Sequence, residues 1–401
     1  MTDGFLPILG GEVPPQYVVG RDEFIKKMWH ILERDSIVLV SERRIGKTSV
    51  IRKMENEPLE GWHPIYLALE SVRSPKEFIK RNYNAVDPIL SKRSRALTRL
   101  AGLLDRIGGT KAGNWHVPAL EEYWKELLAA ILLDIAENFE ERVVFFWDEL
   151  PLMISNISKD HGPTVAMELL DVLRDHRLAD TSGKIRMVYT GSIGLHLVLS
   201  ELRQARYMNE PTNDMYKAPL EALSDNHARE LAGRLLTGSV EKKGTAIADK
   251  AEELAKRIAT VTDGLPFYIN HVVFLLSELE RPVTVKDVDD AMDSLIFDPE
   301  DKAEFSHYSE RIKVYYVFDP MARDLAYAIL NVVCHSAAPI KETSIWDAVV
   351  AQIELTKSDL FRETLDMLEK DHYLVRSEVE GERTYRFKYS VIRRWWQKKR
   401  G

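Results

Sequence analysis

Short apolar runs alternate with longer segments of helical periodicity through the first half of the chain. The intervening segments, such as 120–139 and 165–177, carry apolar residues at helical spacing. Buried strands that alternate with helices predict an α/β fold with a parallel sheet, because each connection must cross the sheet before the next strand begins. The runs that we predict to be these strands are rich in β-branched and aromatic residues, and they are 36–40, 64–69, 142–147 and 184–190.

The strand pattern stops after residue 223, and the segments 224–236, 246–260, 266–279 and 285–295 show helical periodicity alone. Beyond a polar stretch lie further helices and a pair of alternating runs, 373–379 and 384–389, which predict a hairpin. Helices followed by a hairpin are typical of a winged helix. The predicted domains are therefore an α/β core over 1–220, a helical lid over 221–300, and a linker helix with a winged helix over 301–401.

The amino-acid composition excludes several classes of protein. The 401 residues include 55 Lys plus Arg against 63 Asp plus Glu, a net charge of −8, which excludes a wholly basic nucleic-acid coat. The 45% apolar content excludes disorder as the main state. The single cysteine, Cys334, can form no internal disulfide, so we expect a cytoplasmic location. No apolar run approaches the roughly 18 residues that span a bilayer, and we expect no membrane association.

The loop after the first predicted strand ends in Gly46, Lys47 and Thr48, the last three residues of a P-loop motif. In that motif backbone N–H groups at a helix N-terminus bind phosphate oxygens, the lysine reaches the β/γ-phosphates and the threonine binds Mg²⁺. Such a triplet is common by chance, so its position between a strand and a helix is what gives it weight. Ser41 replaces the first glycine of the motif, and we expect serine to reach a similar conformation at modest cost.

A second motif follows at the end of the run 142–147, where Asp148 and Glu149 succeed an apolar strand. At the carboxyl edge of a parallel sheet, Asp148 would face the magnesium ion and Glu149 would be the base for the attacking water. A solvated acidic strand end is the alternative interpretation. The two motifs together predict a P-loop NTPase that uses ATP or ADP with Mg²⁺.

Five segments of the chain carry a resemblance to a known family, and they are 17–23, 43–49, Asp148 with Glu149, 190–192 and 264–266. They follow one another in the order seen in archaeal-type ATPases of the STAND branch of AAA+ proteins, and the chain resembles that family over nearly its whole length. The resemblance implies a slowly hydrolysing molecular switch, in which ATP drives domain rearrangement and an unidentified protein partner or effector is bound.

The resemblance also implies roles for single residues. Val19, Gly20 and Arg21 would line the adenine pocket, Ser192 would be a sensor beside Asp148, and Pro266 would approach the nucleotide from the lid. Simpler interpretations are a turn with a helix cap, a strand-ending loop and a helix N1 residue. The predicted nucleotide-binding set is Val19, Gly20, Arg21, Arg44, Ile45, Gly46, Lys47, Thr48, Ser49 and Pro266, with Lys47, Glu149 and Ser192 as catalytic residues and Thr48 and Asp148 as metal ligands.

Several arginines are further candidates. Arg43 and Arg44 lie in the P-loop and would contact phosphate, a neighbouring subunit or the adjacent domain, or else are solvated. Proteins of the AAA+ class usually hydrolyse ATP between subunits, which leaves a homo-oligomer open and makes Arg203 or Arg206 the nearest candidate to act in trans. Arg311 is a weaker candidate for a phosphate contact.

The C-terminal domain gives a mixed signal for DNA binding. Residues 320–401 hold 14 Lys plus Arg against 12 Asp plus Glu, and four acids on the helix 358–370 would repel phosphates. The tail 393–400 has five cations beside Trp395 and Trp396, which either stack on bases or complete a core. We therefore expect at most weak DNA binding. A DNA-associated AAA+ ATPase and a nucleotide-stabilised scaffold are the alternative functions.

Overall fold

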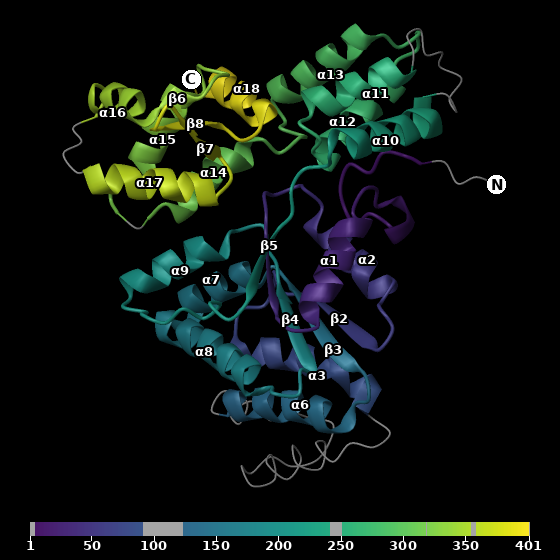
Figure 1. Cartoon of the computed structure of the whole chain (residues 1–401), viewed down its shortest axis with the longest axis vertical. Helices are drawn as coiled ribbons and strands as arrows, with labels where there is room; N and C mark the ends of the chain where they lie inside the picture. Colours follow the sequence, from purple (N-terminus) through teal and green to yellow (C-terminus); the bar gives the residue numbers. More distant parts are fainter. Residues whose placement is uncertain (1–4, 91–122, 241–250, 318, 354–357, 401) are drawn as a thin grey trace. The chain divides into compact units, whose positions relative to one another are not determined.

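The computed structural model describes residues 5–90, 123–240, 251–317, 319–353 and 358–400 (Figure 1). These residues form two compact units. The core unit comprises Asp22–Val40 and Lys47–Pro219, and the C-terminal unit comprises 5–21, Ser41–Gly46 and 220–400. The chain therefore passes from one unit to the other between Gly46 and Lys47, inside the predicted P-loop.

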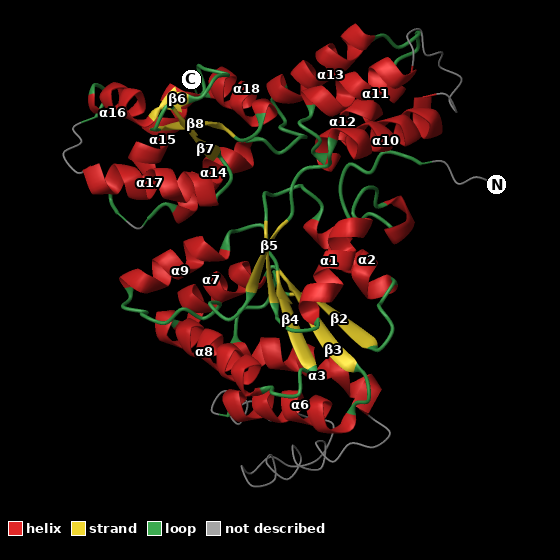
Figure 2. Ribbon diagram, in the orientation of Figure 1, coloured by secondary structure: helices red, strands yellow, loops and turns green. Residues whose placement is uncertain are grey.

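A five-stranded sheet in which every neighbouring pair is parallel forms the centre of the core unit (Figure 2). The order is β2-β3-β4-β1-β5, which confirms the predicted α/β class. The last strand had a weak signal in the sequence because Ala218 is its only buried residue. The strands are β1 (Ile37–Val40), β2 (Trp62–Ala68), β3 (Arg142–Asp148), β4 (Ile185–Tyr189) and β5 (Tyr216–Pro219).

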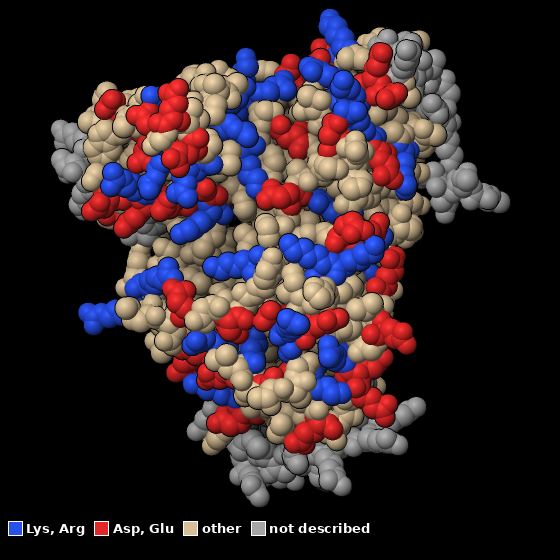
Figure 3. Space-filling model, in the orientation of Figure 1, with Lys and Arg blue, Asp and Glu red and all other residues tan. Residues whose placement is uncertain are grey.

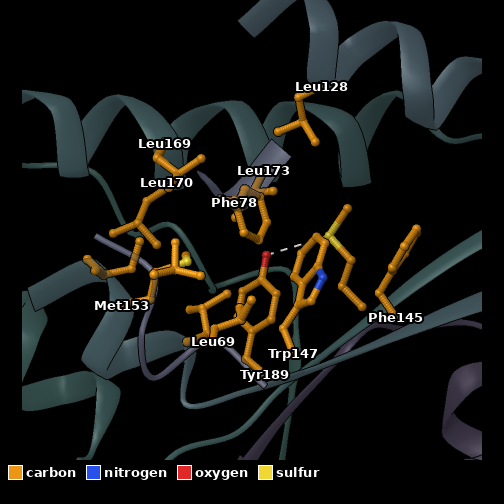
Figure 4. Packing of buried hydrophobic residues seen from close by; sticks show 14 of the residues in the cluster. Leu69, Phe78, Leu128, Phe145, Trp147, Met153, Leu169, Leu170, Leu173 and Tyr189 are labelled. Atoms are coloured by element: carbon orange, nitrogen blue, oxygen red, sulfur yellow. Dashed lines mark hydrogen bonds between the residues drawn. The ribbon is translucent and has the colours of Figure 1, made fainter. Parts of the chain in front are cut away.

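Helices cover both faces of this sheet, and an apolar cluster packs beneath α3, α6, α7 and α8 (Figures 1 and 4). Trp147 is fully buried there, stacks on Tyr189 and donates from Nε1 to Oδ1 of Asn82 at 3.1 Å. These contacts fix the carboxyl end of β3. The helices of this unit are α1 (Asp22–Leu32), α2 (Lys47–Asn56), α3 (Pro75–Leu90), α6 (Trp124–Asn138), α7 (Leu150–His161), α8 (Pro163–Ala179) and α9 (Leu195–Gln204). Residues 120–122 of the predicted helix 120–139 lie outside the described residues.

The C-terminal unit begins with a short 3₁₀ helix, η1 (Pro15–Tyr17), and continues after β5 with a group of helices. Residues 246–250 of the predicted helix 246–260 lie outside the described residues. The helices are α10 (Asp225–Leu235) with the π-helical turn η2 (Leu236–Val240), α11 (Ala251–Val261), α12 (Pro266–Ser277) and α13 (Val285–Phe297).

The rest of the unit combines helices with a three-stranded antiparallel sheet of order β6-β8-β7. The predicted hairpin is confirmed, and Glu380 and Gly381 form its turn with positive φ. The elements are α14 (Ser306–Tyr315), α15 (Ala322–Val333), β6 (Ile340–Lys341), α16 (Glu342–Val350), α17 (Ser358–Lys370), β7 (Leu374–Val379), β8 (Glu382–Phe387) and α18 (Ser390–Lys399).

The last helix, α18, supplies two large side chains to the core. Trp395 is 5% exposed and Trp396 is fully buried, and the indole of Trp396 donates to Oδ1 of Asn331 at 2.8 Å. The tryptophans therefore complete a core, and the alternative interpretation, in which they stack on bases, is wrong. At the start of α18, the Asp263 carboxylate accepts from the backbone N–H of Val391 at 2.7 Å. Among the described helices, none combines the length and apolar content that crossing a bilayer requires.

Candidate nucleotide site

The loop between β1 and α2 carries the predicted phosphate-binding residues. α2 begins at Lys47, whose side chain is buried, and Thr48 and Ser49 lie in its first turn. Gly46 has a φ of 98°, and a Cβ there would meet no atom within 4 Å, so glycine is required for its backbone conformation rather than for space. Ser41 does not have a positive φ, so it replaces glycine without that strain. The first N–H groups of an α-helix lack partners within the helix, which suits this loop to an anion.

The two predicted metal ligands are in contact. The Thr48 hydroxyl donates to Oδ2 of Asp148 at 2.8 Å, and the Tyr66 hydroxyl donates to the same oxygen at 3.1 Å. Oδ1 of Asp148 accepts from the backbone N–H of Glu149 at 3.1 Å. One hydroxyl and one carboxylate fit Mg²⁺, which keeps several waters and takes its other ligands from phosphates. The described residues hold no cluster of three or more His, Cys, Asp and Glu that would suit another metal.

Tyr66 is a site residue that the sequence reasoning missed. It lies on β2 opposite Phe146 of β3, which brings its hydroxyl to the end of the strand that carries Asp148. The guanidinium of Arg52, from α2, lies 3.9 Å from the centre of its ring. A tyrosine within an apolar strand resembles any other core aromatic in the sequence, and only the parallel register of β2 and β3 reveals the contact.

The predicted base and the predicted sensor are bonded to each other. Glu149 adopts the left-handed conformation, with φ 61° and ψ 29°, and this aims its carboxylate at Ser192. The backbone N–H of Ser192 donates to both carboxylate oxygens, at 2.8 and 2.9 Å, and its hydroxyl donates to Oε2 at 2.9 Å. A Cβ at Gly191 would lie 2.8 Å from Cδ of Pro151, so glycine permits this close approach.

Burial raises the pKa of the Glu149 carboxyl, and the nearby Asp148 charge adds to this effect, while the bonds from Ser192 oppose it. A raised pKa suits a residue that must accept a proton. In the observed arrangement, however, both carboxylate oxygens are engaged by Ser192. The three bonds from Ser192 take up most of the roughly four acceptor positions of this carboxylate, so they would compete with a water molecule that uses Glu149 as its base.

In the C-terminal unit, one of the predicted adenine-pocket residues, Arg21, contacts the P-loop segment 41–46. Arg21 is buried and donates from Nη2 to the carbonyl of Ile45 at 2.9 Å and from Nη1 to the carbonyl of Glu221 at 2.8 Å. Burial lowers the pKa of Arg21 to about 10. Gly20 has a φ of 68°, and a Cβ there would lie 2.5 Å from the ring of His227. Arg21 thus holds a loop carbonyl, and its role with Val19 and Gly20 at adenine stays a prediction.

Pro266 is the first residue of α12, the position that proline favours in helices. The preceding Gly264 has a φ of 67°, and a Cβ there would lie 2.5 Å from the carbonyl oxygen of Leu223. The backbone N–H of Leu223 donates to the carbonyl of Gly264 at 3.0 Å. The turn before α12 is therefore closely packed, and a contact of Pro266 with nucleotide stays a prediction.

The remaining arginines have defined surroundings. Arg43 and Arg44 both pair with Glu304, and Arg44 lies 4.3 Å from the centre of the Phe267 ring, so both are held by other residues of the C-terminal unit. Arg311 is buried and paired with carboxylates. Arg203 is half exposed and pairs with Glu210, while Arg206 is exposed with a φ of 68°. A role in trans for either Arg203 or Arg206 stays a prediction.

Comparison with known proteins supports the fold. No protein-family profile matches the chain, and no curated protein matches it by sequence. Among solved structures, a Walker-type ATPase of Pyrococcus abyssi is similar, with a TM-score of 0.64 at 16% identity over 97% of this chain and 98% of that one. The ORC2 protein of Aeropyrum pernix, solved in ADPNP–ADP complexes, is similar with a TM-score of 0.55 at 14% identity over 98% of this chain and 96% of that one. At these identities the likeness shows the fold alone, which is the P-loop NTPase fold.

Proposed function

We propose that the chain is an ATP-binding and slowly ATP-hydrolysing molecular switch of the STAND/AAA+ type. The observation that carries this proposal is the Thr48–Asp148 contact beside the start of α2, with Glu149 next in sequence and bonded to Ser192. Slow hydrolysis requires a helix N-terminus that binds phosphate, a pair of magnesium ligands, and a base whose carboxylate is restrained by hydrogen bonds. The similarity to nucleotide-binding structures of the same fold supports the proposal.

Five residues of the core unit have a role in this mechanism. Lys47 would compensate the charge of the β/γ-phosphates, and Thr48 and Asp148 would hold Mg²⁺, which would supply positive charge to stabilise the transferred phosphoryl group. Tyr66 fixes the Asp148 carboxylate through its hydrogen bond. Glu149 would accept the proton of the attacking water, and the three bonds from Ser192 would lower its strength as a base and so keep turnover slow.

We further propose the domain assignment that underlies the switch. Residues 1–220 form the ATPase core, 221–300 the lid, and 301–401 a linker helix with a winged helix, whose hairpin is β7 and β8. A switch requires that nucleotide makes different contacts in two states of the protein.

A DNA-associated ATPase is the second candidate, favoured by the similarity in fold to the ORC2 protein. The charges of the C-terminal domain argue against strong binding. Arg362 lies 3.4 Å from Glu342, and Arg376 lies 3.7 Å from Glu369, so acids accompany the cations near α17. Figure 3 shows acidic side chains interspersed with basic ones over the face it draws. We therefore propose weak DNA contact at most, and a protein partner as the main ligand of this domain.

The experiment that tests the proposed function is turnover of ATP with Mg²⁺ by wild type and by the variant Glu149→Gln. The amide keeps the shape of the side chain but cannot accept the proton, so we expect binding to be kept and hydrolysis to fall by two or more orders of magnitude. An unchanged rate would place the base elsewhere. Nucleotide binding with no turnover in wild type would instead favour the nucleotide-stabilised scaffold.

A further inference from the structure

Three buried charged side chains join the P-loop to α14 and to the end of α17, all within the C-terminal unit. Nη1 of Arg311, on α14, donates to Oε1 of Glu42 at 3.0 Å, and Nη2 donates to Oδ1 of Asp371. The exposed fractions are 1% for Glu42, 4% for Arg311 and 0% for Asp371. A buried charge without its partner is far more costly than an exposed one, and the same guanidinium stabilises both carboxylates.

Arg311 is also linked to the backbone of the loop, through Glu42. The Oε1 atom of Glu42 that accepts from Arg311 also accepts from the backbone N–H of Arg43 at 2.6 Å. On the other side, the Tyr316 hydroxyl donates to Oδ2 of Asp371 at 3.3 Å. The chain of bonds therefore runs from the loop backbone, through Glu42 and Arg311, to Asp371 just beyond α17.

The residues before α14 and in its first turn hold the neighbouring part of the loop. Arg43 donates to Glu304 at 3.0 Å and contacts Nδ1 of His307 at 2.6 Å, and Arg44 pairs with Glu304. Burial and the nearby Arg43 and Arg311 charges lower the pKa of His307 to about 3, so its neutral ring can accept from Arg43. Three consecutive loop residues, 42–44, are thus tied to the segment 304–311.

We propose that Arg311 is a positioning residue for the P-loop, which couples the position of Asp371 to the conformation of the loop and so to nucleotide affinity. This inference rests on the proposed function, because it concerns the same nucleotide site. If α17 moves, Arg311 cannot keep its bonds to both carboxylates. Either its bond to Glu42 breaks, or the loop moves together with α17. A protein partner that displaces α17 would thereby change nucleotide affinity without touching the nucleotide.

The test is a titration of ADP with Mg²⁺ against wild type, Arg311→Met, Glu42→Gln and the double variant. Arg177→Met is the matched control, because that guanidinium is equally buried, at 4% side-chain exposure, and pairs with Asp214 within the core unit. Thermal unfolding establishes that each variant is folded. A further titration of ATP in a Glu149→Gln background gives the same comparison without turnover.

We expect Arg311→Met to weaken ADP binding by about tenfold and Arg177→Met by less than about twofold. Because Arg311 acts through Glu42, the double variant should bind no more weakly than Arg311→Met alone. Affinity equal to wild type in Arg311→Met, or losses that add in the double variant, would overturn the inference.

Asp371→Asn serves where Arg311→Met fails to fold, since the amide is isosteric and can still accept a bond from Arg311. We expect its ADP affinity to fall by about twofold to threefold, because the bond between Arg311 and residue 371 is weakened but not lost. Unchanged affinity in folded Asp371→Asn would overturn the inference. Wild type that binds no nucleotide would instead overturn the proposed function itself, so the two failures are distinguishable.

Discussion

Replacement of Ser192 by alanine should accelerate ATP hydrolysis. All three bonds that hold the Glu149 carboxylate come from Ser192, and the substitution removes the one from its hydroxyl while the two from its backbone N–H remain. A hydrogen bond to a charged group contributes about 1.5 to 3 kcal/mol, and we take the lower end because Ser192 is partly exposed. Since about 1.4 kcal/mol corresponds to a factor of ten in rate, we expect kcat to rise by up to about tenfold.

The assay is steady-state phosphate release at saturating ATP and Mg²⁺, with KM measured in parallel. KM should stay within about twofold of wild type, because Ser192 is bonded to the base and not to Thr48 or Asp148. In a Glu149→Gln background the same substitution should have no effect, since the restrained base is absent. A fall in kcat for Ser192→Ala would refute this reasoning and would favour the sensor role in which Ser192 acts on the phosphate.

Three other predictions concern pH, the core and DNA. Because burial raises the pKa of Glu149 above its ordinary 4.5 and the base must be ionised, the rate should fall with decreasing pH before an exposed glutamate would protonate; a pH–rate profile without that shifted limb would contradict this. Trp396→Ala removes a fully buried side chain and should lower the free energy of unfolding by about 3–5 kcal/mol, as measured by denaturant titration, whereas a cost below about 1 kcal/mol would contradict its place in the core. Replacing the exposed Lys398, Lys399 and Arg400 by glutamate should weaken any duplex DNA binding more than Arg362→Glu does, as measured by titration with duplex DNA. These substitutions keep the buried tryptophans, which a truncation would remove. Sequence-selective binding that is lost only in Arg362→Glu would contradict this expectation.

The sequence predicted those features that have a local pattern. The buried runs that became β1 to β4 are continuous and apolar, and the hairpin of β7 and β8 alternates. The strand β5 was less visible because only Ala218 is buried in it. The triplet Gly46, Lys47 and Thr48 and the pair Asp148 and Glu149 were found because strand ends mark them.

Contacts between polar residues far apart in the sequence could not be predicted in this way. Arg311 is 269 positions from Glu42 and 60 from Asp371, and neither separation has any periodic signature. The hydroxyl of Tyr66 reaches Asp148 across 82 positions through the register of two strands. Such pairs follow from the tertiary fold, because burial makes each charge or hydroxyl require a partner that local spacing does not specify.

The central claim, that the loop between β1 and α2 binds the phosphates of ATP, is tested most directly by Lys47→Ala. Lys47 is the buried cation at the start of α2, and alanine removes the charge that compensates the β/γ-phosphates. The measurement is equilibrium binding of ATP with Mg²⁺ to wild type and to the folded variant. We predict a loss of affinity of at least about a hundredfold, typical of removing one partner from a charge-assisted contact. Wild-type affinity in Lys47→Ala would contradict the assignment of this loop as the nucleotide site.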